Sequence, residues 1–323
     1  MIIVTGMPRS GTTFVGRLLA ETKQFSYLHE PLHAERGIEG ISNWFPFIPM
    51  DAGSADPVAT SIASLIACKA RYKRPLRRPG TKSALLHLAS HFIHSRSHWD
   101  YLMHQLRWGR RDLLLKDASL ALCTAWILKN YPTSKAVIMI RHPVAVALSM
   151  RKMNWRFDDR CLWDQPCLVE RFLVPHGIPR TMQLDHDVQV AWAWRTIYSI
   201  LQEQLLDIDP NRYLFVRHVD VCLQAHEFGK KIVEFSGGRM TPAASRFLDL
   251  RTDGENVSAR PGKVHDLSRN SRKLVDSWKR SANPNMISVI MGIAEPVFSM
   301  FYPNAEEAAD SDCDSQVSQS ICA

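Results

Sequence analysis

The sequence predicts an α/β fold in which a central parallel sheet is flanked by helices. Three observations support this. Short apolar runs alternate with helical patterns along most of the 323 residues. A loop bounded by two glycines stands directly between the first apolar run and the first helical pattern. Hydrophobic residues make up 46% of the chain and charged residues 22%, as in ordinary globular proteins. This composition excludes a wholly disordered chain, a fibrous repeat and a coiled coil.

The elements follow from the periodicity of the apolar residues. Strands are expected at residues 1–5, 25–28, 113–115, 136–140 and 213–216. Helices are expected at residues 11–20, 120–129, 188–206, 225–235, 272–280 and 286–300. Pro143 is placed to begin one further helix in its first turn. Pro296 is expected to kink or end the last helix, because proline lacks a backbone N–H.

Two stretches interrupt this pattern. Residues 51–111 are helical and basic, and residues 153–180 mix Trp, Pro, Cys and charge without a clear period. We expect both to be insertions over one face of the sheet, where acceptor-binding loops usually sit. Residues 1–303 are predicted to form a single domain with these helical insertions, and residues 304–323 a disordered acidic tail.

The charge is unevenly distributed. Lys and Arg number 40 and Asp and Glu 32, which gives a net charge of +8. Five acidic residues and no basic residue lie in 304–323, so the net charge of the first 303 residues is +13. This excess indicates an anionic ligand, which could be a nucleotide, a nucleic acid, an acidic glycan or an anionic membrane. Solubility alone is the alternative.

The sequence shows no targeting, membrane or metal signal. No apolar stretch reaches the ~20 residues that a helix needs to cross a bilayer. No basic segment precedes the apolar start of the chain, so we expect no signal peptide. The seven cysteines are scattered, without a Cys-x-x-Cys pair or zinc-ligand spacing, as expected for free thiols in a reducing cytoplasm. A bridge between Cys161 and Cys167 is the alternative.

The glycine-bounded loop reads Gly6-Met7-Pro8-Arg9-Ser10-Gly11-Thr12-Thr13. A strand, such a loop and a helix together predict a phosphate cradle and hence a P-loop-containing nucleotide-binding fold, because backbone N–H groups and the helix dipole point at the anion. The usual triphosphatase loop places a lysine where this chain has Thr12, and here the cation is Arg9. The alternative is a purely structural turn.

A second anion site is predicted at the end of the strand 136–140. A P-loop kinase carries a magnesium-binding acid at such a strand end, whereas this chain has Arg141-His142-Pro143 with Ser149 two helical turns later. Arginine would repel a metal and attract a second phosphate, so no metal site is expected. A strand-end salt bridge is the alternative for Arg141.

These two motifs in combination resemble the sulfotransferases that use 3′-phosphoadenosine 5′-phosphosulfate as donor. The segment His29-Glu30-Pro31-Leu32-His33 is most similar to the Golgi-type and bacterial carbohydrate branch. The resemblance implies in-line transfer of a sulfuryl group to an acceptor hydroxyl. It implies that the 5′-phosphosulfate is bound by Pro8, Arg9, Ser10, Gly11, Thr12 and Thr13. It implies that the 3′-phosphate is bound by Arg141 and Ser149, and by Arg269 in a late loop that closes over the nucleotide.

Glu30 is the candidate general base. Its spacing from the loop arginine is similar to that of the proposed base in tyrosylprotein and carbohydrate sulfotransferases. A carboxylate within hydrogen-bond reach can take the proton that the acceptor hydroxyl loses. A Glu30–Arg9 ion pair is the alternative reading. His29 and His33 flank Glu30 and could serve as the base instead, with His33 as the reserve candidate.

Further polar and aromatic residues are weaker candidates. Lys116 is expected either to neutralise charge on the transferring group or only to pair with Asp117. Arg217 is expected to be structural. Four tryptophans are expected either to stack on adenine or a sugar or, more commonly, to pack in the core: Trp155, Trp163, Trp192 and Trp194.

The predicted function is therefore sulfuryl transfer to a hydroxyl, most plausibly on a polysaccharide or glycolipid, by a cytoplasmic enzyme. A peptide tyrosine or a small metabolite stays open as acceptor. One alternative is a P-loop small-molecule kinase. Another is a non-catalytic polyanion-binding protein that uses the basic run, which no nucleic-acid motif accompanies and which consists of Lys69, Arg71, Lys73, Arg74, Arg77, Arg78 and Lys82.

Overall fold

The computed structural model of the chain describes residues 1–74, 95–106, 111–252 and 270–303. The acidic tail, Arg269 and the last three residues of the basic run, Arg77, Arg78 and Lys82, lie outside these ranges. The predictions made for them therefore stay predictions.

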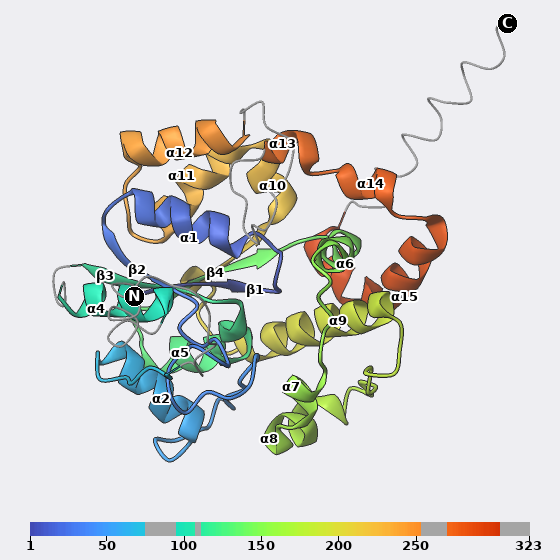
Figure 1. Cartoon of the computed structure of the whole chain (residues 1–323), viewed down its shortest axis with the longest axis horizontal. Helices are drawn as coiled ribbons and strands as arrows, with labels where there is room; N and C mark the ends of the chain where they lie inside the picture. The colour runs from blue at the N-terminus through green and yellow to red at the C-terminus, as the bar shows by residue number, and fades with distance from the viewer. Residues whose placement is uncertain (75–94, 107–110, 253–269, 304–323) are drawn as a thin grey trace, which may run out of the picture.

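A parallel sheet of five strands, in the order β2-β3-β1-β4-β5, forms the centre of the fold (Figure 1). Its strands are β1 (Ile2–Gly6), β2 (Phe25–His29), β3 (Asp112–Lys116), β4 (Lys135–Ile140) and β5 (Tyr213–Arg217). The expected α/β class and all five expected strands are confirmed, each to within one residue at either end. Val4 pairs with both Lys116 of β3 and Val137 of β4, so β1 is the central strand.

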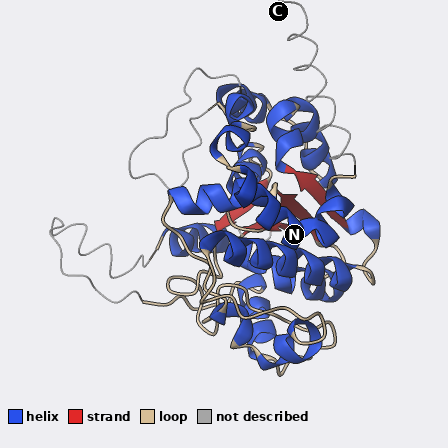
Figure 2. Cartoon of the chain, turned by 90° about the vertical axis from the view of Figure 1, so that its right-hand side faces the viewer, coloured by secondary structure: helices blue, strands red, loops and turns tan. Residues whose placement is uncertain are grey.

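Helices cover both faces of the sheet, as Figure 2 shows. One face carries α1 (Thr12–Glu21), α10 (His218–Leu223), α11 (Ala225–Phe235) and α12 (Pro242–Thr252). Their apolar residues Leu18, Ile232 and Leu248 are wholly buried in one cluster with Val4 of β1. Because side chains alternate along a strand, the neighbouring Ile3 points into the cluster on the other face.

The opposite face has the larger core. Its helices are α2 (Pro57–Ile66), η1 (Ala118–Cys123), α5 (Thr124–Asn130), α6 (Pro143–Lys152), α7 (Arg160–Trp163), α8 (Pro166–Leu168), η2 (Val169–Leu173), α9 (His186–Leu205) and α15 (Pro284–Phe301). Helix α9 contributes the fully buried Trp194 and Tyr198, which pack with Phe301 of α15. The remaining elements are α4 (Arg96–Gln105), which packs against β2, and η3 (Pro210–Arg212), α13 (Ser271–Leu274) and α14 (Ser277–Ser281).

The described parts of both expected insertions bury side chains in this larger core only. Ile62 and Tyr101, from residues 51–111, are buried in this cluster. Leu162 and Leu173, from residues 153–180, are buried in it as well. Both segments therefore pack on the same side of the sheet. Whether they bind an acceptor stays a prediction.

One expectation about the late helices was wrong, because the helix expected at residues 272–280 is divided into α13 and α14. A second was wrong in part. Pro296 does not end the last helix, since α15 continues to Phe301. Pro296 is exposed, whereas Val297, Phe298 and Phe301 are buried, so core packing on one side of the helix maintains it beyond the proline. Helices α10 and α12 were not predicted.

Within the described residues, α15 is long and apolar enough to cross a membrane by length and composition, with a mean hydropathy of 1.3. The apolar pattern of the sequence did not single out this helix, which has 18 residues and includes Glu295. A core helix passes the same test, and α15 packs against α9 and α6 in this structure. The cysteines in the described ranges, Cys161 and Cys167 included, are free thiols.

Candidate active site

The candidate site lies at the carboxyl end of the sheet, where parallel strands bring their following residues to one edge. Strand β1 leads into the glycine loop, β4 into Arg141, and β5 into His218. Strand β2 leads into Glu30, and its last residue His29 pairs with Lys116, the last residue of β3. The strand order therefore places Lys116 beside the strand that leads into the loop, and the predicted base on the far side of Lys116.

The loop adopts the tight path that its glycines allow. Gly6 and Gly11 have φ of 137° and 94°, a region that favours glycine. A Cβ at Gly6 would lie 2.2 Å from the carbonyl oxygen of Met139, and one at Gly11 would lie 2.9 Å from the ring of His218. Neither position has room for a side chain, so the loop packs closely against β4 and against the residue that follows β5.

The side chain of Tyr198, on α9, forms hydrogen bonds that hold this loop in place. Its buried hydroxyl accepts a hydrogen bond from the backbone N–H of Met7 at 3.1 Å and donates one to the carbonyl of Met139 at 2.7 Å. The hydroxyl of Ser10 lies 3.4 Å away. Burial raises the pKa of Tyr198 to about 12, so it stays a neutral donor. The sequence offered no signal for this residue, which lies mid-helix among apolar neighbours.

Arg9 connects the two predicted anion sites. Its Nε donates to the hydroxyl of Ser149 at 3.0 Å, and its backbone carbonyl accepts a hydrogen bond from Nη1 of Arg141 at 2.9 Å. Its guanidinium carbon lies 5.7 Å from the ring centre of Trp155, which is 37% exposed. The structure thus brings together Arg9, Arg141 and Ser149.

Arg9 and Glu30 both have a strained backbone. Their φ values are 70° and 50°, in the left-handed region that non-glycine residues rarely adopt, and Asn154 beside Trp155 has a φ of 53°. Strain of this kind persists only where the surroundings enforce it, and it concentrates at functional sites. Lys23 and Cys68, which are not predicted site residues, have φ values of 62° and 55°, so this strain does not by itself assign a role to Arg9 or Glu30.

Glu30 forms an ion pair with Lys116. The Lys116 Nζ lies 2.5 Å from Oε1 of Glu30, and His29 Nε2 lies 3.8 Å from Oε2. The side chain of Lys116 is only 1% exposed and that of Glu30 is 29% exposed. The Glu30 carboxylate is therefore partly exposed to solvent while its ammonium partner is buried.

Lys116 does not pair with Asp117. Asp117 turns away and accepts backbone hydrogen bonds from Leu32 at 2.7 Å and from Ser119 at 2.9 Å. Burial and the nearby carboxylate of Glu30 raise the pKa of Asp117. Gly16 of α1 makes room for Lys116, because a Cβ there would lie 2.9 Å from the lysine Cγ.

His33, the reserve base, is poorly prepared for that role. Its Nδ1 accepts a hydrogen bond from the backbone N–H of Glu35 at 3.2 Å, and its ring packs edge-on against Trp44 at 4.4 Å between centroids. Burial and Arg36 lower its pKa. With Nδ1 used as the acceptor, the neutral ring carries its proton on Nε2 and has no second lone pair to offer.

The start of α6 shows how Arg141 is held. Pro143 occupies the first turn as expected, and the carbonyl of Arg141 accepts a hydrogen bond from the indole of Trp194 at 2.9 Å. His142 stacks on Trp278 with ring centroids 4.1 Å apart, and burial lowers its pKa to about 3. Trp194 is therefore a core residue that orients the strand end.

His218 is a site residue that sequence reasoning missed. Its ring packs on Gly11, and burial and the charge of Arg141 hold its pKa well below the ordinary value. Its position directly after β5 was the available signal. Arg217 forms two hydrogen bonds of 2.8 Å with Asp220, and its structural role stays a prediction.

Other candidates lie away from these groups. Trp163 stacks with Arg180, and Trp192 with Arg195. Lys73 of the basic run donates to the carbonyls of Ala34 and Ile41, so it supports the loop that follows Glu30. In the part of the chain that the structure describes, no three His, Cys, Asp or Glu side chains gather as metal ligands would.

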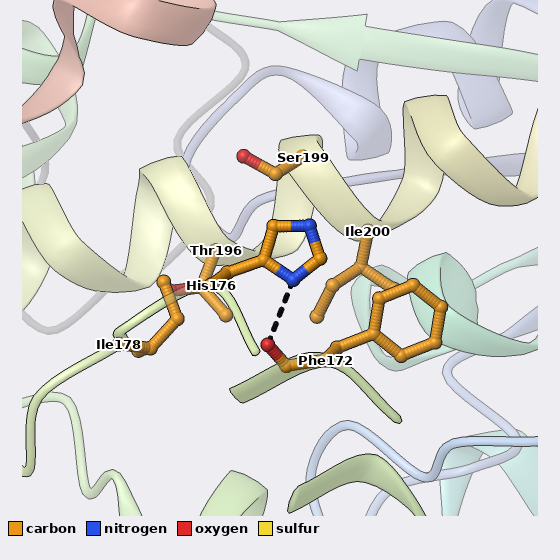
Figure 3. Close-up of a pocket in the computed structure, with 6 residues that line it drawn as sticks. All are labelled: Phe172, His176, Ile178, Thr196, Ser199 and Ile200. Carbon is orange, nitrogen blue, oxygen red and sulfur yellow. Dashed lines mark hydrogen bonds between the residues drawn. The ribbon is translucent and has the colours of Figure 1, made fainter. Parts of the chain in front are cut away.

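A small apolar pocket lies between the 169–178 segment and α9 (Figure 3). His176 Nδ1 contacts the carbonyl of Phe172 there at 2.8 Å. None of the predicted site residues lines this pocket, whose walls are Phe172, His176, Ile178, Thr196, Ser199 and Ile200.

Comparison with known proteins gives a family and several related folds. A model of the sulfotransferase family matches residues 2–242. No protein of curated function matches the chain significantly. A sulfotransferase domain from the curacin biosynthetic pathway is 17% identical, with a TM-score of 0.47, over 92% of this chain and 96% of that one.

Two further solved structures are also similar to the chain. The sulfotransferase domain of the Synechococcus PCC 7002 olefin synthase is 16% identical, with a TM-score of 0.45, over 92% of this chain and 93% of that one. Retinol dehydratase, solved with androsterone and the inactive cofactor PAP, is 13% identical, with a TM-score of 0.39, over 91% of this chain and 79% of that one.

Proposed function

Because the chain belongs to the sulfotransferase family and is a transferase that uses 3′-phosphoadenosine 5′-phosphosulfate, we propose that its acceptor is a carbohydrate hydroxyl and its general base Glu30. The family expected from the two motifs is confirmed. The acceptor, the base and the carbohydrate branch belong to the proposal.

The donor would span the glycine loop and the start of α6. Backbone N–H groups of the loop and the guanidinium of Arg9 would hold the 5′-phosphosulfate, and Arg141 and Ser149 the 3′-phosphate. The observation that carries this assignment is the link between the two sites, in which Arg141 Nη1 donates to the Arg9 carbonyl at 2.9 Å and Arg9 Nε to Ser149 at 3.0 Å. A ligand with anions at both ends fits two cations that are held in one connected unit.

The transfer step takes place on the side of the loop where Lys116 and Glu30 lie, away from α6. The acceptor oxygen forms a bond to sulfur while the bond between sulfur and the 5′-phosphate oxygen breaks. The acceptor proton passes to the carboxylate of Glu30, and the negative charge that develops on the leaving phosphate is stabilised by Arg9 and the loop N–H groups. Lys116 lies between Glu30 and the loop, where its ammonium can neutralise charge on the transferring sulfuryl group.

Lys116 also affects how readily the Glu30 carboxylate accepts a proton. Its ammonium, 2.5 Å from Oε1 of Glu30, stabilises the carboxylate and thereby reduces its affinity for a proton. A sulfuryl group beside Lys116 would compete for the same ammonium and restore that affinity. Proton removal would thus become favourable when the donor is in place.

A carbohydrate acceptor is supported by two features. The segment that contains Glu30 resembles the carbohydrate branch, and Trp155 offers a partly exposed indole beside Arg9 on which a sugar ring can stack. A polysaccharide or glycolipid acceptor accords with these features.

The test is a transfer screen with a donor labelled in its sulfate. Glycans, phenols and tyrosine peptides are offered to the intact protein and to Glu30→Gln. We expect label to enter a glycan with the intact protein and not with the variant. Transfer to phenols or peptides alone would exclude the carbohydrate acceptor, and undiminished transfer by the variant would exclude Glu30 as the base.

A further inference from the structure

We propose that Tyr27 and His29 form a positioning arm that orients the carboxylate of Glu30. The proposal rests on the assignment of Glu30 as base and goes beyond it, because it gives a role to two residues that do not touch the reacting atoms. Tyr27 and His29 are two residues apart on β2 and so share one face of the strand.

The arm is a chain of three polar groups. The hydroxyl of Tyr27 lies 2.9 Å from Nδ1 of His29, and Nε2 of the same ring lies 3.8 Å from Oε2 of Glu30. Lys116 holds the other carboxylate oxygen, Oε1. Both oxygens of the proposed base therefore face a nitrogen.

The chemistry of the phenol determines which nitrogen of His29 carries hydrogen. Tyr27 is largely buried against Gly16 and Lys116, and burial raises its pKa, so its hydroxyl keeps its proton. A hydroxyl that donates to Nδ1 leaves the proton of the neutral imidazole on Nε2, the nitrogen that faces Glu30. The opposite tautomer would direct a lone pair at a carboxylate, which is electrostatically unfavourable.

Two helices fix the arm in place. Arg17 of α1 lies 5.9 Å from the ring centre of Tyr27, and the charges of Arg96 and Asp100 on α4 also act on this tyrosine. Asp100 accepts a hydrogen bond from the backbone of His29, which fixes the strand end itself. Together with Glu30 and Lys116, these are the charged groups that face the arm from α1, α4 and β3.

The arm explains how a residue with a strained backbone keeps one side-chain direction. Glu30 follows β2 with a φ of 50°, and its side chain is partly open to solvent. An exposed carboxylate held on one oxygen can still rotate about the bond that carries the group. An N–H directed at the second oxygen from 3.8 Å, longer than a hydrogen bond, favours one orientation of the carboxylate electrostatically. Small errors in orientation are costly for proton transfer.

The first test is spectroscopic and needs no acceptor. The full chain is labelled with ¹⁵N-histidine, and the His29 signals are identified by their loss in His29→Asn. We expect the neutral ring of the intact protein to carry its proton on Nε2, and Tyr27→Phe to produce a mixture of tautomers. A ring protonated on Nδ1, or one that Tyr27→Phe leaves unchanged, would overturn the proposal.

The second test uses matched amides at position 29. The amide nitrogen of Gln reaches about as far as Nε2, whereas that of Asn ends near Nδ1. With sulfate release to water or to the best acceptor of the screen, we expect His29→Asn to lower kcat roughly tenfold and His29→Gln to restore most of it. In His29→Asn the acid side of the kcat profile should move to higher pH, because a donor that stabilised the carboxylate is gone.

The outcomes distinguish a failure of the positioning arm from a failure of the assignment of Glu30 as general base. Equal impairment of both amide variants, or no effect of His29→Asn while Glu30→Gln is inactive, would overturn the arm and leave the base assignment intact. Full turnover by Glu30→Gln would overturn the base assignment. Binding of adenosine 3′,5′-bisphosphate should be the same in all these variants.

Discussion

Nη1 of Arg141 donates a hydrogen bond to the backbone carbonyl of Arg9 at 2.9 Å, so the residue expected to hold the 3′-phosphate also supports the loop expected to hold the 5′-phosphosulfate. The two residues are 132 positions apart in sequence, and adjacent strands bring them together. The two anion sites are therefore mechanically connected.

Arg141→Ala should weaken the binding of adenosine 3′,5′-bisphosphate about tenfold to hundredfold, the cost of one charge-assisted contact. Binding of adenosine 5′-phosphate should fall less, by the loss of loop support alone. Calorimetric titration of both nucleotides measures the ratio. Arg217→Ala, which removes an arginine already paired with Asp220, is the matched control. An equal loss for both nucleotides would remove the 3′-phosphate assignment.

Glu30→Gln should lower turnover by about 10²–10⁴-fold and leave bisphosphate binding nearly intact, because it removes the proton acceptor and keeps the shape of the side chain. Single-turnover transfer and nucleotide binding are measured on the same preparations. Glu35→Gln changes an exposed carboxylate of the same loop and should keep full activity. If binding and turnover fall together, Glu30 acts on the nucleotide and not as the base.

Lys116→Met keeps the apolar stem that packs on Gly16 and removes the ammonium beside Glu30. We expect a marked loss of kcat and a coupling of about 1–3 kcal/mol between positions 30 and 116 in a double-mutant cycle of unfolding. The exposed pair Lys230 and Glu234, 3.8 Å apart on one helix, is the control and should couple by only about 0.2–0.5 kcal/mol. A similar small value at the buried lysine would indicate that the ion pair does not form in solution.

Tyr198→Phe should destabilise the fold by about 1–3 kcal/mol, because it leaves the N–H of Met7 and the carbonyl of Met139 without the hydroxyl that joins them. Nucleotide binding should weaken as well, since the loop loses its support. Denaturant unfolding and nucleotide titration measure the two effects. Tyr213→Phe alters a tyrosine at the far end of β5 and should change neither.

Much of the fold and the members of the site could be predicted from the sequence. Buried strands of a parallel sheet read as short apolar runs, which is why all five were found. Parallel strands also bring their carboxyl ends together, so the order of strands and motifs along the chain is enough to assign Arg9, Arg141 and Glu30 to one edge of the sheet.

The partners of these residues could not be predicted in the same way. Lys116 meets Glu30 and not Asp117 because β2 lies beside β3, and strand order is not encoded in the local pattern of either strand. Tyr198 and His218 reach the loop from α9 and from the end of β5, across sequence distances at which periodicity carries no information. Pro296 does not end its helix, because the packing of buried neighbours outweighs a missing hydrogen bond on an exposed helix face.

The stability of the fold should depend on pH through His142. Its pKa is lowered from 6.5 to about 3 in the folded protein, mainly by burial and also by Lys279 and Arg141. Below pH 6.5 the unfolded chain binds a proton there that the folded chain does not, so this contribution to stability is complete above pH 6.5 and declines as the pH falls towards 3. His142→Phe keeps a ring that can stack on Trp278 and removes the titrating group.

We therefore expect the free energy of unfolding of the intact protein to fall more steeply between pH 6.5 and 4.5 than that of His142→Phe. The difference in slope should approach about 1.4 kcal/mol per pH unit, the value for one proton. Urea titrations at several pH values measure both slopes, and His218, whose pKa is also lowered, contributes equally to the two proteins and cancels. Parallel curves would show that His142 is not held neutral, and that the stacking of Trp278 beside Arg141 does not exclude water from this ring.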